Sequence, residues 1–197
     1  MNITFQNPDI KFYFSFQCPY SFMAWELMKI VLKGTKLTMQ PFAIGLNPPG
    51  NSKFHFREIW NSQRWQRLIS EAESLKLKIH QPEKYVSDLT AARAIKAYGS
   101  LNAEDYITSV FRAFFTARID ISIFTALRPF LQSEGLDATI LSAAIEDPTT
   151  EKDYNDQVLL WGHERLRMLP TIECADERFS GLVDKPGLER LLRSLIE

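Results

Sequence analysis

The chain has few cysteines and no long apolar run. Only Cys18 and Cys174 occur among its 197 residues, which is too few for a disulfide framework. We therefore expect a reducing compartment, the cytoplasm. No stretch approaches the roughly 20 apolar residues of a transmembrane helix. Residues 1–9 have neither the basic nor the apolar region of a signal peptide, so we expect no membrane partner.

Net charge and metal-ligand clusters are scarce as well. The net charge is −1 at pH 7, so the chain as a whole has no bias towards nucleic acid. Basic residues predominate over 1–100 and acidic residues over 101–197, a pattern typical of a solvated surface that can also steer a small anion. His55, His80 and His163 lack metal-ligand spacing. We expect neither a metal nor a nucleic-acid partner.

The remaining composition is that of an ordinary globular protein, with 45% hydrophobic and 24% charged residues. The length suits one domain with an elaboration. Aromatic residues fill 10–16, which predicts a buried strand. Apolar residues at helical spacing predict a helix over 20–33 that ends at Gly34. Alternation over 36–42 predicts a second strand.

A long helical block is predicted after this second strand. Residues 44–53 are rich in glycine, proline and asparagine, which predicts a loop. Helical periodicity then predicts helices over residues 58–75, 87–98, 103–115, 123–132, 137–145 and 150–166. No strand pattern of comparable strength occurs between residues 54 and 167.

The C-terminal end returns to strand patterns. Residues 170–174 and 178–181 predict two short strands joined by a tight turn. Asp184 is predicted to cap a last helix with an apolar face that contains Leu188, Leu191, Leu192 and Leu195. We therefore predict an α/β layer made of residues 1–53 and 168–197, with a helical insertion domain over residues 54–167.

The sequence Cys18-Pro19-Tyr20-Ser21 lies where the first strand turns into the first helix. Proline favours the first helical turn, so Cys18 is predicted to lie at the helix N-terminus, where the helix dipole stabilises anions. Such a position lowers the pKa of a cysteine and produces a nucleophilic thiolate. The alternative is an inert buried thiol, since free cysteine is among the most buried residue types.

Residues 13–24, YFSFQCPYSFMA, resemble the start of DsbA-like thioredoxin domains. The subgroup in question includes FrnE-like proteins, 2-hydroxychromene-2-carboxylate isomerases and kappa-class glutathione transferases. Residues 41–51, 64–72 and 111–137 are also similar to stretches of this family. The resemblance implies a thioredoxin-like fold with an all-α insertion domain between its second and third strands.

The resemblance makes Cys18 and Ser21 the candidate catalytic residues, with Pro19 and Tyr20 lining the site. Disulfide oxidases of the family carry Cys-Pro-x-Cys, whereas the isomerases and kappa-class enzymes carry Ser-Pro-Tyr at this turn. This chain has Cys18 in the reactive position and Ser21 in place of the second cysteine. It therefore lacks a local resolving thiol. The resemblance leaves Cys18 able to form a mixed disulfide or to activate the thiol of glutathione, the implied co-substrate.

Residues 168–171 are similar to the cis-proline loop of the family, which implies that Leu169 and Pro170 lie against the reactive turn. The alternative is a trans proline that opens an edge strand. The family usually has two glycines before this proline, and here Arg165 and Met168 stand in their place. Arg165 is a candidate for holding a thiolate or carboxylate, or else an ordinary surface residue.

Two further candidate ligand-binding residues come from the resemblance alone. Asp184 occupies the position of an acidic residue that holds the free amino group of glutathione in kappa-class enzymes. The alternative is a plain helix cap. Asn51, in the loop after the second strand, is a similar candidate.

The leading hypothesis is a thiol- or glutathione-dependent oxidoreductase that uses Cys18 in thiol–disulfide exchange or in glutathione-assisted conversion of a small molecule. One alternative is a glutathione-dependent isomerase or transferase. Another is a non-catalytic thioredoxin-fold binding protein, which the missing second cysteine favours, and a third is a redox regulator held by a partner. The expected partner is a small-molecule or thiol substrate, and the relatives suggest a homodimer.

Overall fold

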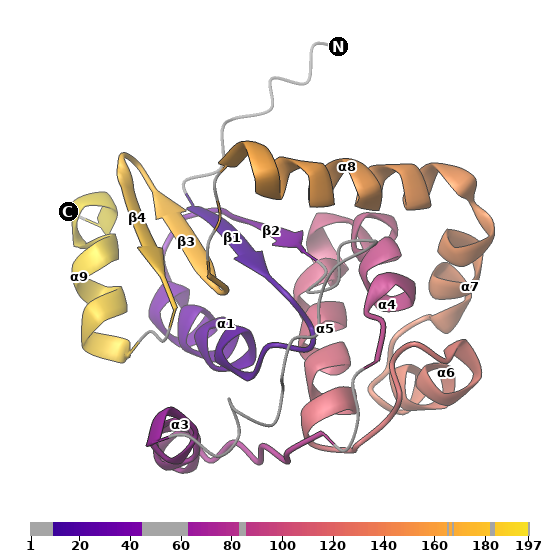
Figure 1. The fold of residues 1–197 in the computed structure, drawn as a ribbon, viewed down its shortest axis with the longest axis horizontal. Coiled ribbons are helices and arrows are strands. Elements are labelled where there is room, and N and C mark those ends of the chain that lie inside the picture. Colours follow the sequence, from indigo (N-terminus) through magenta and orange to yellow (C-terminus); the bar gives the residue numbers. More distant parts are fainter. Residues whose placement is uncertain are drawn as a thin grey trace.

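The computed structural model describes residues 10–44, 63–82, 86–164, 166, 168–181 and 184–196 (Figure 1). The elements in chain order are β1 (Ile10–Phe14), α1 (Pro19–Leu32), β2 (Met39–Ala43), α3 (Gln63–Ser74), α4 (Leu89–Arg93), α5 (Ile95–Phe115), α6 (Phe124–Ser133), α7 (Ala138–Glu146), α8 (Pro148–Glu164), β3 (Thr171–Cys174), β4 (Glu177–Ser180) and α9 (Lys185–Ile196). None of the helices within these residues is long and apolar enough to cross a membrane.

The described strands form one mixed sheet in the order β2-β1-β3-β4. β1 pairs with β2 in parallel and with β3 antiparallel, and β3 pairs with β4 antiparallel. β1 ends at Phe14, two residues before the predicted end, because the chain turns at Ser15 towards the start of α1. The hydroxyl of Ser15 accepts a hydrogen bond from the Gln17 amide at 3.2 Å, which stabilises this turn.

One face of the sheet carries the aromatic side chains of the core. Phe12 and Phe14 lie against Trp25 of α1, with ring centroids 5.7 and 6.3 Å apart. Phe14 also lies 5.6 Å from Phe111 of α5. The helical segment between β2 and β3 therefore shares its core with the sheet and the first helix.

Helices α4 to α7 gather beyond the β2 edge of the sheet and α8 contacts β2, whereas α3 packs against α1 and α9 lies beside β4 at the other edge (Figure 1). The two helices predicted over 87–98 and 103–115 are divided differently in the structure. α4 ends at Arg93, and α5 continues from Ile95 to Phe115 through a kink at Gly99. Gly99 has a φ of +67°, which glycine adopts without a steric penalty.

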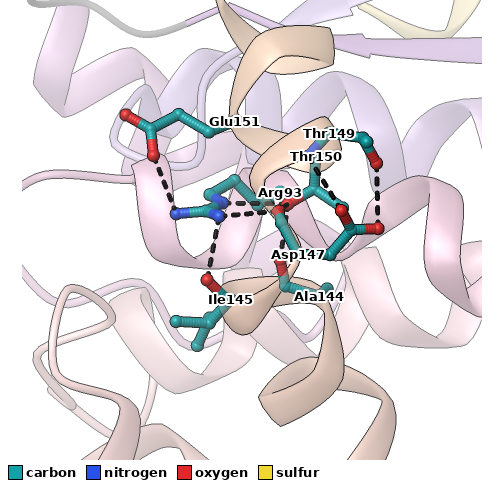
Figure 2. Close-up of polar contacts among 7 residues, drawn as sticks. All are labelled: Arg93, Ala144, Ile145, Asp147, Thr149, Thr150 and Glu151. Carbon is teal, nitrogen blue, oxygen red and sulfur yellow. Dashed lines mark hydrogen bonds and ion pairs between the residues drawn. The ribbon is translucent and has the colours of Figure 1, made fainter.

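Arg93 ties three of these helices together, as Figure 2 shows. Its guanidinium donates hydrogen bonds to the carbonyls of Ile145 at 2.8 Å and Asp147 at 3.0 Å, at the C-terminus of α7. It also donates to the hydroxyl of Thr150 at 3.0 Å and pairs with Glu151 at 3.3 Å, both on α8. A planar group with several donors is suited to this role, since α7 would otherwise end in unpaired carbonyls.

The C-terminal elements follow the prediction closely. Asp184 caps α9, because its carboxylate accepts a hydrogen bond from the Gly187 amide at 2.8 Å. Leu188, Leu191 and Leu192 are buried, as the predicted apolar face requires. Cys174 is buried beside this helix, and its thiol donates to the Leu191 carbonyl at 3.7 Å. Both cysteines are free, in agreement with the absence of a disulfide framework.

Candidate functional site

Cys18 lies at the N-cap position of α1, as predicted. Its φ of −91° and ψ of 113° are extended, and Pro19 begins the helix. The Cys18 carbonyl accepts the first helical hydrogen bond, from the Phe22 amide at 3.1 Å. Proline has no amide hydrogen, so the amides that hydrogen-bond to the sulfur come from Tyr20 and Ser21.

The Cys18 sulfur faces the loop before β3. Its thiol donates to the Leu169 carbonyl, with 3.6 Å between Sγ and the oxygen. The Leu169–Pro170 peptide bond is cis. The fold therefore brings together Cys18 and Leu169, which are 151 positions apart in the chain.

The surroundings of the sulfur are largely apolar. Cys18 has 7% of its surface exposed and packs in a cluster with Tyr13, Ile44, Leu166 and Leu169. This burial corrects the prediction of a lowered pKa. Burial raises the pKa of the Cys18 thiol, and it outweighs the Ser21 hydroxyl and the amides of Ser21 and Tyr20, which lower it. The protonated thiol is therefore favoured, because burial in this apolar environment destabilises the thiolate by more than the hydrogen bonds at the helix terminus stabilise it.

Ser21 and Tyr20 have different surroundings within the first turn of α1. Ser21 is fully buried, and its hydroxyl accepts a hydrogen bond from the Ser15 amide at 3.4 Å. The hydroxyl hydrogen of Ser21 can therefore donate to the Cys18 sulfur, and this hydrogen bond lowers the pKa of the thiol. Tyr20 is half-buried and packs against the cluster around Cys18, and Pro19 is buried.

The other predicted site residues include two whose contacts the structure describes, Pro170 and Asp184. Pro170 is buried and its carbonyl accepts from the Gly181 amide at 2.8 Å. The carboxylate of Asp184 caps α9 and also lies 3.7 Å from the guanidinium of Arg67 on α3. Asn51 and Arg165 lie outside the described residues.

The sequence analysis missed a buried polar cluster beside the reactive turn. Ser15, Gln17 and Asp88 are 0%, 1% and 3% exposed. The Ser15 hydroxyl donates to the Asp88 carboxylate at 2.9 Å, and the Tyr154 hydroxyl donates to it at 3.4 Å. The Val86 amide donates to the side-chain carbonyl of Gln17 at 3.3 Å. The segment before α4 therefore holds the turn that carries Cys18.

Burial raises the pKa of Asp88 from 3.8 to about 6. Hydrogen bonds from the Ser15 hydroxyl, from its own amide, from the Tyr154 hydroxyl and from the Phe16 amide lower it in part. An aspartate just before a helix usually caps it, and Asp88 does occupy the N-cap position of α4. Its side chain makes no capping hydrogen bond, however. Sequence spacing could indicate the helix start but not that the carboxylate turns towards Ser15.

A cavity of about 380 Å³ lies between β2, α4, α5 and α8. Phe42 and Tyr154 line it, together with the ion pair of Lys96 and Asp153, which is 2.8 Å long. Phe42 also stacks on Tyr13 at 5.0 Å and packs against the cluster that contains Cys18. Cys18 does not line this cavity. Within the described residues no group of three histidine, cysteine or acidic side chains is arranged to hold a metal ion.

A mixed sheet, a cysteine at the N-terminus of the first helix and a cis-proline loop that faces it define a domain of the thioredoxin type with a helical insertion. Comparison with known proteins agrees with this class. Residues 9–193 match the family model of the DSBA-like thioredoxin domain, and the chain belongs to that family.

Solved structures with the same fold include enzymes of different activities. A 2-hydroxychromene-2-carboxylate isomerase aligns with a TM-score of 0.75 and 18% identity, over 94% of this chain and 93% of that one. The cytosolic disulfide reductase DsbM from Pseudomonas aeruginosa, described with GSH, aligns with a TM-score of 0.63 and 14% identity, over 94% and 96%. Reduced DsbA1 from Neisseria meningitidis aligns with a TM-score of 0.61 and 13% identity, over 98% and 87%.

At these identities the likeness concerns the fold. It confirms the predicted fold class, a thioredoxin-like domain with helices inserted between its second and third strands. No curated protein matches the sequence.

Proposed function

We propose that the protein is a thiol- or glutathione-dependent oxidoreductase that reacts through Cys18 alone. The observation that supports this most directly is the contact between the Cys18 sulfur and the Leu169 carbonyl, 3.6 Å apart beside a cis-proline. The Leu169 backbone would bind an extended thiol substrate by strand addition. The Ser21 hydroxyl would stabilise the sulfur anion that forms during reaction.

The proposed reaction removes glutathione from a mixed disulfide in two exchanges. The Cys18 thiol first gives its proton to solvent, and the thiolate attacks the glutathione sulfur of the substrate. A bond forms between the two sulfurs, and the substrate leaves as a thiolate that takes up a proton. A second glutathione, as its thiolate, then attacks the Cys18–glutathione disulfide. The products are glutathione disulfide and the regenerated Cys18 thiol, so that glutathione is the reductant.

An external thiol is needed because the chain offers no resolving cysteine near the site. Ser21 stands where two-cysteine oxidases carry the second thiol, and Cys174 hydrogen-bonds to α9 instead. A reducing compartment such as the cytoplasm supplies glutathione and keeps both thiols free. We therefore place the proposed reaction there.

The raised pKa of Cys18 favours a second candidate function. A protonated thiol donates a hydrogen bond, as the serine at this turn of the isomerases and kappa-class enzymes can. In this alternative Cys18 donates to the thiolate of bound glutathione, which is itself the nucleophile. The protein would then be a glutathione-dependent isomerase or transferase of a small molecule.

The variants Cys18→Ser and Cys18→Ala separate these functions. The assays are release of glutathione from a glutathionylated peptide and conjugation of glutathione to 1-chloro-2,4-dinitrobenzene. The oxidoreductase predicts that both variants lose the first activity. The transferase predicts that Cys18→Ser retains the second activity while Cys18→Ala loses it. A chain with neither activity and no retention on immobilised glutathione would be a non-catalytic relative.

A further inference from the structure

We propose that the ionised carboxylate of Asp88, which the helical insertion supplies, positions the turn that carries Cys18 and thereby promotes reactions of its thiol. Asp88 is then a positioning residue, since it acts through Ser15 and Ser21 rather than on a substrate. The inference deepens the proposed function and rests on it, because it concerns the same thiol.

The contacts run from the helical insertion to the sulfur in three steps. Asp88 accepts from the Ser15 hydroxyl at 2.9 Å. The Ser15 amide donates to the Ser21 hydroxyl at 3.4 Å, and the Ser15 carbonyl accepts from the Cys18 amide at 3.1 Å. The Ser21 hydroxyl in turn stabilises the thiolate of Cys18. Asp88 therefore fixes the residue that holds both Ser21 and the backbone of Cys18.

The hydrogen bonds to Asp88 favour its ionised form. The Ser15 hydroxyl already accepts the Gln17 amide, so that its own hydrogen points to Asp88. The Tyr154 hydroxyl and the Phe16 amide also donate to this carboxylate. A protonated carboxyl would bring a further donor among the groups that already donate to it. Its proton would displace at least one of them, and the turn would lose part of its support.

The elements around Asp88 carry several titratable and charged side chains. The described titratable and charged side chains of these elements include Cys18 on the turn, Arg93 on α4, Lys96, Tyr98 and Tyr106 on α5, and Glu151, Lys152, Asp153, Tyr154 and Asp156 on α8. The charged members form ion pairs with one another, namely Arg93 with Glu151, Lys96 with Asp153, and Lys152 with Asp156. The shift of the Asp88 pKa arises from burial and hydrogen bonds, and its value of about 6 lies below that of the raised Cys18 thiol.

The test is the pH dependence of the reaction of Cys18 with methyl methanethiosulfonate, a neutral reagent that is specific for thiols. The protein is the full chain with Cys174→Ala, so that only Cys18 reacts. Below the pKa of Cys18 the logarithm of the rate rises by one for each pH unit as the thiolate population grows. Ionisation of Asp88 should add a further increase of about threefold to tenfold centred near pH 6, which corresponds to one hydrogen bond to the sulfur.

Three variants in the same background decide the outcome. Asp88→Asn and Ser15→Ala should lose the extra step, and Tyr154→Phe should move it to higher pH because a hydroxyl that donates to the carboxylate is removed. A step that persists in Asp88→Asn would overturn the inference, as would its absence in the parent protein. Should Asp88→Asn fail to fold, a step that stays at the same pH in Tyr154→Phe would also overturn the inference.

The assay needs neither glutathione nor turnover. A protein that shows the step but no activity would overturn only the proposed function. An active protein without the step would overturn only the role of Asp88.

Discussion

Asp88 illustrates how a single buried carboxylate links stability and reactivity in this protein. Its pKa is about 6 in the folded chain and 3.8 as a model value. Between these values the folded state holds more protons than the unfolded state, so that stability falls as the pH rises from about 4 to about 6. Above pH 6 this pKa shift lowers the free energy of unfolding by about 3 kcal/mol. We infer that Asp88 keeps its charge, despite this cost, because the carboxylate supports the turn that carries Cys18.

We predict that Asp88→Asn raises the free energy of unfolding at pH 8 by about 1–3 kcal/mol, because an uncharged amide can accept from Ser15 without the cost of a buried charge. The gain should disappear near pH 4, where the wild-type carboxyl is protonated. Denaturant unfolding at both pH values measures it. Equal stability differences at the two pH values would mean that Asp88 does not titrate as described.

Ser21 provides the second prediction at the residue scale. Its hydroxyl lowers the pKa of Cys18, so Ser21→Ala should raise that pKa further, because one hydrogen bond to the sulfur is lost. The absorbance of the thiolate at about 240 nm during an alkaline titration of the Cys174→Ala protein reports the change. Ser133→Ala, an exposed position on α6, is the matched control. An unchanged titration midpoint in Ser21→Ala would contradict a hydrogen bond from Ser21 to the sulfur.

At the scale of elements, the ends of α7 and α8 depend on Arg93 (Figure 2). Its side chain is 11% exposed and donates to two backbone carbonyls and one hydroxyl. Lysine keeps the charge but cannot serve these acceptors together. Arg93→Lys should therefore lower the free energy of unfolding by about 2–4 kcal/mol. Calorimetric or denaturant unfolding measures this loss.

Lys96 offers the comparison for Arg93. It pairs with Asp153 on the surface, with 66% of its side chain exposed, and exposed ion pairs contribute little. Lys96→Ala should change the stability by less than about 1 kcal/mol. A loss for Arg93→Lys that is no larger than this would contradict the role given to the guanidinium.

Features set by neighbouring residues could be predicted at this scale. Pro19 after Cys18 indicates the start of α1, and Asp184 before an apolar helical pattern indicates the cap of α9. The split of the helical stretch at Ala94 and Gly99 could not be predicted in the same way. Arg93 favours an early end of α4 through contacts with α7 and α8, which lie more than 50 residues further along the chain.

At the scale of the whole molecule, the helical insertion and the sheet form one core. Phe22 of α1 stacks on Phe111 and Phe115 of α5 at 5.3 and 5.7 Å. Phe111 is fully buried and also contacts Phe14 and Phe16. We predict that Phe111→Ala lowers the free energy of unfolding by about 3–5 kcal/mol.

The shared core also predicts cooperative unfolding. Circular dichroism and tryptophan fluorescence should give coincident transitions for the wild type and for Phe111→Ala. Separate transitions for the two probes would indicate that the insertion and the sheet unfold independently.

The chemistry of the site is a property of this whole-molecule scale, which explains the failed part of its prediction. The position of Cys18 at a helix N-terminus follows from local sequence, and that alone predicts a lowered pKa. The burial that raises the pKa comes from Ile44, Leu166 and Leu169, which approach the sulfur from distant parts of the chain. Asp88 reaches Ser15 across 73 positions. No spacing within one segment reports such contacts.

The central claim is that Cys18 alone forms a disulfide with a thiol substrate and that a second thiol must release it. Intact-mass spectrometry of the full chain, incubated with glutathione disulfide at mildly alkaline pH, tests this directly. We predict one glutathione adduct, located on Cys18 by peptide mapping, absent from Cys18→Ala and removed by added glutathione. An unmodified Cys18 under these conditions, or an adduct confined to Cys174, would contradict the account.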